Sequence, residues 1–529
     1  MTPRGYDASA MAAEPEQTSR DHLPFWAFVV LVAVAVLALV TAVVAPAPSA
    51  PALAQGLGPA APINTQFPGL TTFRGNASRS YYGEGPVPTD PVKRWTYPSD
   101  GTKLCSNSAE GGPGSVVKEW CGTGWTGQPN VVPERDGSMT IREGAYDGHY
   151  HFLDAGTGQP VMPDLVTGDL AKGSATSDPD GFPLYYAGSR DNQFRVVAMD
   201  RGEPTVLWSM DSHDTSLVPR PMWNDDWDGA ALVIDDVLIE GGENGWLYLV
   251  RLNRSYDARG LVSVKPDVIA TVPSFDYEEL AAVVQPGSPN ADGLDTRYDV
   301  SVESSVAYRD GVVYVANSGG LITGWDISDV LAGGTDVHRV FRFWTGDDTD
   351  ASIVVDDEGY LYVASEYQRF NDRALRLGQL MKLDPRQTGD SALVWSVPAL
   401  ELGFEGAGGS WSTPAIAGDV VYFTTAAGRV LAVDGGSGDV LWERQIASPS
   451  IASPVVVDGV LLQGDCSGHL YAWDVSDPNA QPALLWNLDL GDCVESTPAV
   501  WHGWLYVGTR AGYLYGIANA DTPAPTATG

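Results

Sequence analysis

The stretch that decides the fold runs from Gly408 to Ile517 and contains the same pattern three times. It reads GGSWSTPAIAGDVVYFTTAAGRVLAVDGGSGDVLW up to Trp442, then SIASPVVVDGVLLQGDCSGHLYAWD and onward to Trp486, then VESTPAVWHGWLYVGTRAGYLYGI. Each copy has three apolar runs separated by Gly or Asp turns, and the first two copies end in a fourth run that closes on Trp. A repeat of about 40–50 residues with four short strands is typical of a β-propeller blade.

Weaker copies precede these three, which brings the total to eight, and they begin near Thr126, Gly181, Trp227, Tyr298 and Asp348. The last copy lacks its Trp-ending strand, whereas VKRWTY around Trp95 has such a strand and no blade of its own. We therefore expect an all-β, eight-bladed propeller of four-stranded antiparallel blades, closed by pairing of 92–97 with the final copy. Segments 265–298 and 368–377 match no strand of the pattern and are expected to be insertions on the third and fifth blades.

An uncharged, apolar segment at 25–45 precedes the propeller. Its 21 residues are long enough to cross a bilayer as a helix, at about 1.5 Å per residue. Basic residues precede it and none follows until Arg74, which predicts a cytoplasmic amino terminus. A cleaved signal peptide is the alternative, because Ala52-Leu53-Ala54 matches a cleavage site. The predicted organisation is a cytoplasmic leader 1–24, a transmembrane anchor or signal peptide 25–45, a Pro/Ala-rich stalk 46–70, the propeller 71–519 and a disordered tail 520–529.

The charge and the cysteines restrict the partners and the compartment. The 529-residue chain has 31 Lys and Arg against 67 Asp and Glu, a formal net charge of −36. Such a surface repels phosphate backbones, which argues against nucleic-acid binding, and it attracts cations or basic partners. The four cysteines fall into two local pairs, Cys105 with Cys121 and Cys466 with Cys493. An exported domain permits disulfides at both pairs, with free buried thiols as the alternative.

The repeat itself carries a family resemblance. VLAVDGGSGDVLW, VVAMDRGEPTVLW and HFLDAGTGQPV follow one pattern, in which an Asp-containing turn is followed by Gly and, in two copies, by Trp. This pattern resembles the pyrroloquinoline-quinone-like (PQQ-like) repeat family. That family includes quinoprotein alcohol dehydrogenases and the non-enzymatic propeller of the outer-membrane barrel assembly machinery. The resemblance covers about 73–517 and implies the fold far more strongly than any chemistry.

One stretch is closer to the dehydrogenases. SRDNQFRVVAMDRGEPTVLW, followed by SHD and WNDDWDGAALVIDDV, is similar to their catalytic region, and GGSWSTP is similar to another of their elements. The resemblance implies that Asp191 is a catalytic base, and that Asn192, Trp227 and Trp411 contact the quinone. Packing between blades is the alternative for Trp227. The chain lacks the adjacent Cys-Cys pair with which those enzymes hold the quinone, and their Asn-bearing calcium element is not recognisable.

The copies also predict an acidic channel mouth. The residue before each first strand lines the channel entrance, and this column reads Thr126, Gly173, Asp228, Glu303, Asp350, Trp411, Ile451 and Glu495. The turns between second and third strands open on the same face and carry Glu143, Asp191, Glu243, Glu366, Asp465 and Arg510. Asp228, Glu303 and Asp350 fall on consecutive blades, and such oxygen donors suit calcium. A solvated acidic rim is the alternative.

Two functions remain open from the sequence. The favoured one is a membrane-anchored, extracytoplasmic binding or scaffold module that takes a protein, glycan or small ligand at its acidic, aromatic face, and that is secreted if the amino-terminal segment is cleaved. The alternative is a PQQ- and calcium-dependent dehydrogenase of alcohols or sugars, with Asp191 as base and calcium held by nearby carboxylates.

Overall fold

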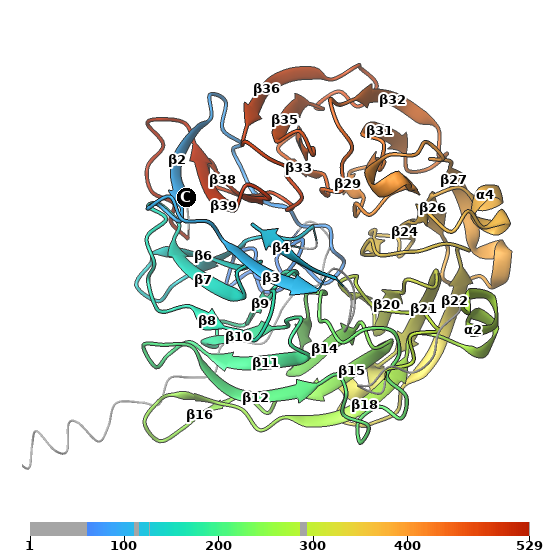
Figure 1. The fold of residues 1–529 in the computed structure, drawn as a ribbon, viewed down its shortest axis with the longest axis horizontal. Coiled ribbons are helices and arrows are strands. Elements are labelled where there is room, and N and C mark those ends of the chain that lie inside the picture. The colour runs from blue at the N-terminus through green and yellow to red at the C-terminus, as the bar shows by residue number, and fades with distance from the viewer. Residues whose placement is uncertain (1–60, 110–115, 126, 286–293, 528–529) are drawn as a thin grey trace, which may run out of the picture. The chain divides into compact units, whose positions relative to one another are not determined.

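The computed structural model describes residues 61–109, 116–125, 127–285 and 294–527. The chain divides into two compact units, Met1–Ser49 and Ala50–Gly529, and only the second contains described residues. Within that unit, eight sheets surround a common centre (Figure 1). Each blade is a four-stranded antiparallel sheet whose first strand is innermost, so the predicted eight-bladed propeller is confirmed.

The first four blades follow one another along the chain. Blade 1 has β5 (Asn130–Pro133), β6 (Met139–Ala145), β7 (His149–Asp154) and β8 (Leu165–Val166); blade 2 has β9 (Thr176–Ser177), β10 (Leu184–Ala187), β11 (Gln193–Ala198) and β12 (Thr205–Asp211); blade 3 has β13 (Leu232–Ile234), β14 (Val237–Gly242), β15 (Trp246–Arg251) and β18 (Asp267–Pro273); blade 4 has β19 (Ala307–Arg309), β20 (Val312–Ala316), β21 (Leu321–Asp326) and β22 (His338–Trp344). Their middle strands are buried on both faces because neighbouring blades pack against them.

The other four blades complete the ring. Blade 5 has β23 (Val354–Val355), β24 (Leu361–Ala364), β26 (Leu380–Leu383) and β27 (Leu393–Val397); blade 6 has β29 (Ala415–Ala417), β30 (Val420–Thr424), β31 (Arg429–Asp434) and β32 (Val440–Gln445); blade 7 has β33 (Val455–Val457), β34 (Val460–Gly464), β35 (His469–Asp474) and β36 (Ala483–Asp489); blade 8 has β37 (Ala499–Trp501), β38 (Trp504–Thr509), β39 (Tyr513–Ala518) and β2 (Val92–Tyr97). β2 pairs antiparallel with β39, with Val92 opposite Ala518. The predicted ring closure is therefore confirmed.

Short elements are inserted between and within the blades. They are the hairpin β3 (Cys105–Ala109) and β4 (Val117–Cys121), the hairpin β16 (Ser255–Tyr256) and β17 (Val262–Ser263), helices α2 (Tyr277–Val283), α3 (Ser328–Leu331) and α4 (Asp372–Leu377), the pair β25 (Glu366–Tyr367) and β28 (Gly408–Gly409), and the 3-10 turns Gly389–Ala392 and Phe404–Gly406. The predicted insertion at 368–377 is α4 with its leading loop. The prediction for 265–298 was wrong in part, because it includes β18, the outer strand of blade 3. DVIATVP in β18 lacks the terminal Trp of the other copies.

A recurring Trp of the outer strands docks one blade on the next at two places in the ring. The indole of Trp95 in blade 8 donates to the Ala155 carbonyl oxygen in blade 1 (3.0 Å), and Trp395 in blade 5 donates to the Gly435 carbonyl oxygen in blade 6 (3.0 Å). Gly438 lies under the second indole with φ near +80°, and a Cβ there would come within 2.8 Å of Trp395. The repeated pairing of Gly with Trp therefore reflects close contact between neighbouring blades.

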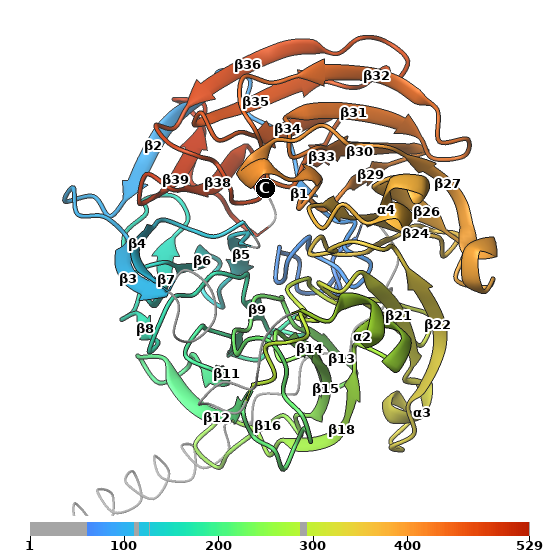
Figure 2. The same ribbon diagram turned by 45° about the vertical axis from the view of Figure 1, so that its right-hand side comes forward.

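The centre of the ring is occupied by the chain itself. Residues 70–84, here called the channel segment, run inside the innermost strands, and every residue from 69 to 82 is buried. The blue segment at the middle of the ring in Figure 2 follows this path. It ends in β1 (Gly83–Glu84), which pairs parallel with β37. Its hydrogen-bonded partners come from all eight blades: Val131, Ser177, Ala231, Tyr308, Val355, Thr413, Pro454 and Val500.

The described residues at both ends of the propeller unit contact the blades, in the segments that were predicted to be a stalk and a disordered tail. Residues 61–70 fall in the segment expected to be a stalk, yet Ile63 and Leu70 are buried in the propeller core. In the tail, the Pro523 carbonyl oxygen accepts from the indole of Trp504 at 2.8 Å. The predicted membrane segment 25–45 lies outside the described residues, and within them no helix combines the length and apolarity that a membrane span requires.

Both cysteine pairs form disulfides, as predicted. Cys105 joins Cys121 across β3 and β4 with an S–S distance of 2.02 Å, and Cys466 joins Cys493 at 2.00 Å. These two disulfides include all four cysteines of the chain. Two disulfides suit a propeller that folds in an oxidising compartment outside the cytoplasm.

A buried histidine beside the closing strand gives the first testable prediction. His151 is 3% exposed and lies 3.2 Å from both Asp147 and Asp164, with the Tyr97 hydroxyl also at 3.2 Å. Burial opposes its charge, but the hydrogen bonds to the two carboxylates prevail and raise its pKa to about 9. Protonated His151 therefore stabilises the fold below about pH 6.5, and this stabilisation is lost as the pH rises through 9.

We expect His151→Gln to be less stable than the wild type by about 3 kcal/mol at pH 6, with the difference vanishing above pH 9. Chemical unfolding of both proteins across this range measures it. His338→Gln, at an exposed histidine, is the control and should follow the wild type. An unchanged pH profile in His151→Gln would show that His151 is neutral in the fold.

Candidate functional site

The loops that enter the innermost strands define one mouth of the channel, and interblade hydrogen bonds give their register. In each bond a backbone amide of one blade donates to a hydroxyl of the next: Gln128 to Ser174 (2.6 Å), Ala230 to Ser305 (2.9 Å), Ser305 to Ser352 (2.9 Å), Ser352 to Thr413 (3.0 Å) and Thr413 to Ser453 (3.0 Å). Two residues before these positions lie Lys172, Asp228, Glu303, Asp350 and Trp411. The prediction of Gly173 in this column was therefore wrong by one residue, since Lys172 takes the position two residues before Ser174.

Asp226, Asp228 and Glu243, here called the blade-3 cluster, form a buried group of carboxylates whose oxygens approach within 4.8 Å of one another. The Lys172 ammonium lies 3.0 Å from Asp226, 2.7 Å from Asp228 and 3.2 Å from Glu243. Arg190 adds a contact to Asp226 at 3.1 Å. Two cations of the protein therefore compensate much of the charge of this cluster, and its predicted member Asp228 is paired with a lysine.

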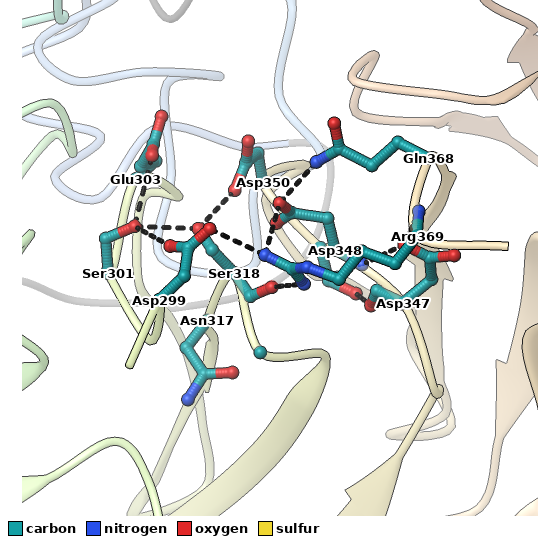
Figure 3. Close-up of polar contacts among 12 residues, drawn as sticks. Asp299, Ser301, Glu303, Asn317, Ser318, Asp347, Asp348, Asp350, Gln368 and Arg369 are labelled. Carbon is teal, nitrogen blue, oxygen red and sulfur yellow. Dashed lines mark hydrogen bonds and ion pairs between the residues drawn. The ribbon is translucent and has the colours of Figure 1, made fainter. Parts of the chain in front are cut away.

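Asp348, Asp350 and Glu366, here called the blade-5 cluster, also approach within 4.8 Å of one another. Asp350 accepts from the Ser318 hydroxyl (2.8 Å), and Asp348 accepts from the Gln368 amide (2.6 Å) and from Arg369 (3.0 Å). Figure 3 shows Asp299 and Glu303 beside this group, joined to each other through the Ser301 hydroxyl. Of the three residues predicted for a metal, Asp350 lies in this cluster and Glu303 lies next to it.

Burial raises the pKa of the carboxyl groups at this mouth. The pKa of Glu303 is raised to about 8, by burial against the lowering effect of Lys172, and that of Asp299 to about 7, by burial and by Asp348. The same cause places the pKa of Asp350 and Glu366 well above the usual range, with Asp348 adding to it. These carboxyls therefore need either protons or a cation to compensate their charge.

The residues that the resemblance assigned to quinone chemistry are engaged in other contacts. Asp191 accepts from the backbone amide of Gly168 (2.7 Å) and pairs with Arg195 (3.0 Å), so both of its oxygens are occupied. Asn192 has φ near +62°, and its backbone carbonyl oxygen accepts a hydrogen bond from the Trp227 indole (3.1 Å).

The two tryptophans assigned to the quinone differ in exposure. Trp227 is 1% exposed and lies between the rings of Phe194 (5.5 Å) and Tyr248 (5.2 Å), as the packing alternative predicts. Trp411 is half-buried, with its ring edge-on to Phe404 at 5.7 Å. Trp227 therefore offers no free ring face to a planar ligand.

The channel end beneath the acidic mouth is almost closed. Its remaining cavity has a volume of about 10 Å³ and is lined by the channel-segment residue Phe73 together with Trp125, Glu303, Ser305, Asp350, Ser352, Thr413 and Ser453. A cavity of this size holds about one water molecule. With the channel filled and Asp191 and Trp227 engaged elsewhere, the described residues do not fit the quinone that the resemblance implied.

The opposite end of the channel segment borders a much larger space, here called the opposite-face cleft. Its volume is about 1020 Å³, within the range that accommodates a ligand. It lies beside blades 5, 6 and 7 and is lined by four tyrosines, one lysine and seven carboxylates: Tyr81, Tyr82, Tyr360, Tyr362, Lys382, Glu84, Asp356, Asp357, Glu358, Asp419, Asp434 and Asp458. Lys382 donates to the Gly435 carbonyl oxygen (2.9 Å) and lies 4.3 Å from the Tyr360 ring centroid. The cleft is therefore strongly acidic.

Comparison with known proteins agrees with this architecture. Residues 289–522 match the family described as outer membrane protein assembly factor BamB. The matched part of the chain, which includes blades 4 to 7 and three strands of blade 8, is similar to the PQQ-like repeat family. No curated protein matches the chain.

Among solved structures, the propeller is similar to quinohemoprotein alcohol dehydrogenase from Comamonas testosteroni. The identity is 13%, the alignment covers 86% of this chain and 81% of the other, and the TM-score is 0.57. It is also similar to quinohemoprotein alcohol dehydrogenase ADHIIG from Pseudomonas putida HK5 (12%, 90% and 83%, TM-score 0.57) and to a europium-containing methanol dehydrogenase (14%, 85% and 98%, TM-score 0.54). Likeness at these identities shows the fold alone.

Several residues of these sites were missed from the sequence. Lys172 was hidden by the one-residue error in register, and Asp226 and Asp348 lie two residues before their columns. The repeated spacing Asp-x-Asp followed by Glu in the next turn was a signal that could have paired them. The opposite-face cleft has no such signal, because its walls come from the turns of three blades and from the channel segment.

Proposed function

We propose that this propeller is a non-enzymatic binding module that works outside the cytoplasm. The observation that carries this proposal is the channel segment, which fills the axis while Asp191 and Trp227 are engaged elsewhere. The disulfides support the extracytoplasmic location. The apolar segment 25–45 would tether the module to a membrane, or would be removed on secretion.

The opposite-face cleft is the place where we propose that a partner binds. Its carboxylates outnumber its single lysine, and that lysine already contacts Tyr360 and Gly435. Asp419 and Asp458 are exposed at the cleft wall. Tyrosine rings and exposed carboxylates such as Asp419 and Asp458 together suit lysine and arginine side chains. The proposed partner is therefore a protein that presents a basic segment.

A short Lys/Arg-rich peptide tests this proposal. We expect it to bind the full chain, more weakly as salt is raised, and we expect Asp419→Lys combined with Asp458→Asn to lower the affinity about tenfold or more. Asn is chosen at 458 because φ there is near +50°. Fluorescence anisotropy of the labelled peptide measures the affinity. Asp136→Lys, at the equivalent turn of blade 1, is the control and should bind as the wild type does.

Two results would contradict the proposal. If the double variant and Asp136→Lys weaken the peptide equally, binding depends on net charge and not on the cleft. If the full chain supplied with the quinone and calcium reduces an artificial dye in the presence of an alcohol or a sugar, the propeller is a dehydrogenase.

A further inference from the structure

The blade-3 and blade-5 clusters occupy equivalent positions of the repeat. The Glu243 amide donates to the Asp226 carbonyl oxygen (3.1 Å), and the Glu366 amide donates to the Asp348 carbonyl oxygen (2.8 Å). Asp228 and Asp350 share the same column of the mouth. The two clusters are thus the same arrangement of three carboxylates, built twice by the repeat.

A cation already occupies the first arrangement. The Lys172 ammonium contacts all three carboxylates of the blade-3 cluster at 2.7–3.2 Å. Lys172 is the column residue of blade 2, immediately before blade 3. The lysine shows that this geometry is compatible with a positive charge held among the three carboxylates.

The second arrangement lacks that lysine. The residue of blade 4 at the position of Lys172 is Glu303, so a carboxylate replaces the ammonium. Asp299 and Asp347 add two further carboxyl groups, which accept from the side chain and from the backbone amide of Arg369, respectively. Among the described residues, Arg369 is the cation that contacts this group, and it binds Asp348 (3.0 Å) and Asp299 (2.6 Å) from one side.

The blade-5 cluster also has buried oxygens without a donor other than a carboxyl. Glu366 is fully buried, and among the described residues the only side chain that could donate to its carboxylate oxygens is the neighbouring carboxyl of Asp350. One oxygen of Asp348 likewise has no donor other than this carboxyl. Asp350 and Glu303 also line the cavity of about 10 Å³, which has room for about one water molecule or one ion. Unpartnered buried carboxylates are costly, so a ligand that accepts their lone pairs is expected here.

We propose that Asp348, Asp350 and Glu366 bind a calcium ion, with Glu303 beside it. Calcium takes carboxylate oxygens at about 2.3–2.6 Å in flexible geometry, which is compatible with oxygens that lie within 4.8 Å of one another. The ion supplies in blade 5 the positive charge that Lys172 supplies in blade 3. This site lies at the acidic mouth and goes beyond the proposed function, since that function uses the opposite-face cleft.

The test is calorimetric titration of the full chain with calcium chloride after treatment with a chelator. We expect one ion per chain and a rise in the thermal unfolding midpoint on adding calcium. Glu366→Gln should weaken binding about tenfold or more, because it removes a charged ligand. Glu303→Lys should abolish binding, because it places an ammonium in the blade-5 cluster as in blade 3. Glu243→Gln, the equivalent change in the lysine-filled cluster, is the matched control and should leave the affinity unchanged.

Two results would overturn this proposal. The first is neither heat nor a shift in the wild-type midpoint with calcium, in which case the carboxyls share protons. The second is an equal loss of affinity in Glu366→Gln and Glu243→Gln, which would place the ion elsewhere at the mouth. If Glu303→Lys does not fold, the pair of Gln variants still decides. Basic-peptide binding to these variants is expected to be unchanged, so failure of this proposal is distinguishable from failure of the proposed function.

Discussion

Replacing Arg79 by Met is expected to lower the free energy of unfolding by about 4 kcal/mol or more. Arg79 is fully buried in the channel segment. Its guanidinium donates to the carbonyl oxygens of Val306 (2.8 Å), Phe73 (2.8 Å) and Ala230 (2.7 Å). Burial lowers its pKa to about 9, with Glu240 opposing this effect, so Arg79 is charged at neutral pH. Methionine would fill much of the volume but would leave these buried acceptors without a donor.

Urea unfolding, followed by tryptophan fluorescence, measures this loss. Arg259→Met is the control, since Arg259 is exposed and pairs only with Asp257 among the described residues, and we expect a change within about 0.5 kcal/mol. Arg79→Lys should recover only part of the stability, because an ammonium cannot reproduce the planar fork. If Arg79→Met unfolds at the wild-type urea concentration, the channel segment is not a stabilising part of the propeller.

Replacing Lys172 by Met should cost about 3–5 kcal/mol, because it leaves buried carboxylates without their cation. Asp226, Asp228 and Glu243 would then face each other with Arg190 as the remaining contact, at 3.1 Å from Asp226. Burial already raises the pKa of Glu243 well above its usual range, even with the lysine present. Loss of the lysine should raise the pKa of Glu243 further. The loss of stability should therefore be smaller at pH 5, where the Glu243 carboxyl is protonated, than at pH 8.

Unfolding curves at these two pH values measure the effect. Lys265→Met, at an exposed lysine, is the control and should be close to neutral. Calcium should restore part of the stability of Lys172→Met, because the variant gives the blade-3 cluster the composition of the blade-5 cluster. An equal loss of stability at both pH values would indicate that lost packing, and not unpaired charge, is responsible.

These two variants test two different parts of the molecule, the channel segment and the acidic mouth. Arg79 and its neighbour Arg74 hold the channel segment to the innermost strands; Arg74 donates to the carbonyl oxygens of Thr413 (2.8 Å) and Pro414 (2.7 Å) on the far side of the ring. Lys172 instead belongs to the acidic mouth.

The repeat pattern was sufficient for much of the fold. The missing outer strand of the last copy predicted that 92–97 would close the ring, and β2 does so. Cys466 and Cys493 were expected to pair, and they are bonded. β18 escaped detection because periodicity alone does not identify a single strand that lacks the terminal Trp of its copies.

The site was only partly predictable for a related reason. Asp228, Glu303 and Asp350 were assigned to the mouth correctly, but their pairing depends on which residue of the preceding blade stands opposite them. A shift of one residue separates Gly173 from Lys172, and that shift decides whether a cluster contains a cation. The register is given by hydrogen bonds between blades, such as Gln128 to Ser174, which only the tertiary structure shows.

The sequence by itself determined the blade count, the closure of the ring, the disulfide pairs and the acidity of the mouth, because each follows from a local pattern repeated at a regular spacing. Only the tertiary structure decided that residues 70–84 fill the axis, that Lys172 pairs with one carboxylate cluster and not its equivalent, and that the large cleft lies on the opposite face. These features join residues from several blades to a segment far away in the chain. Such contacts depend on distances across the ring. The repeat pattern describes the strands of one blade and therefore cannot predict those distances.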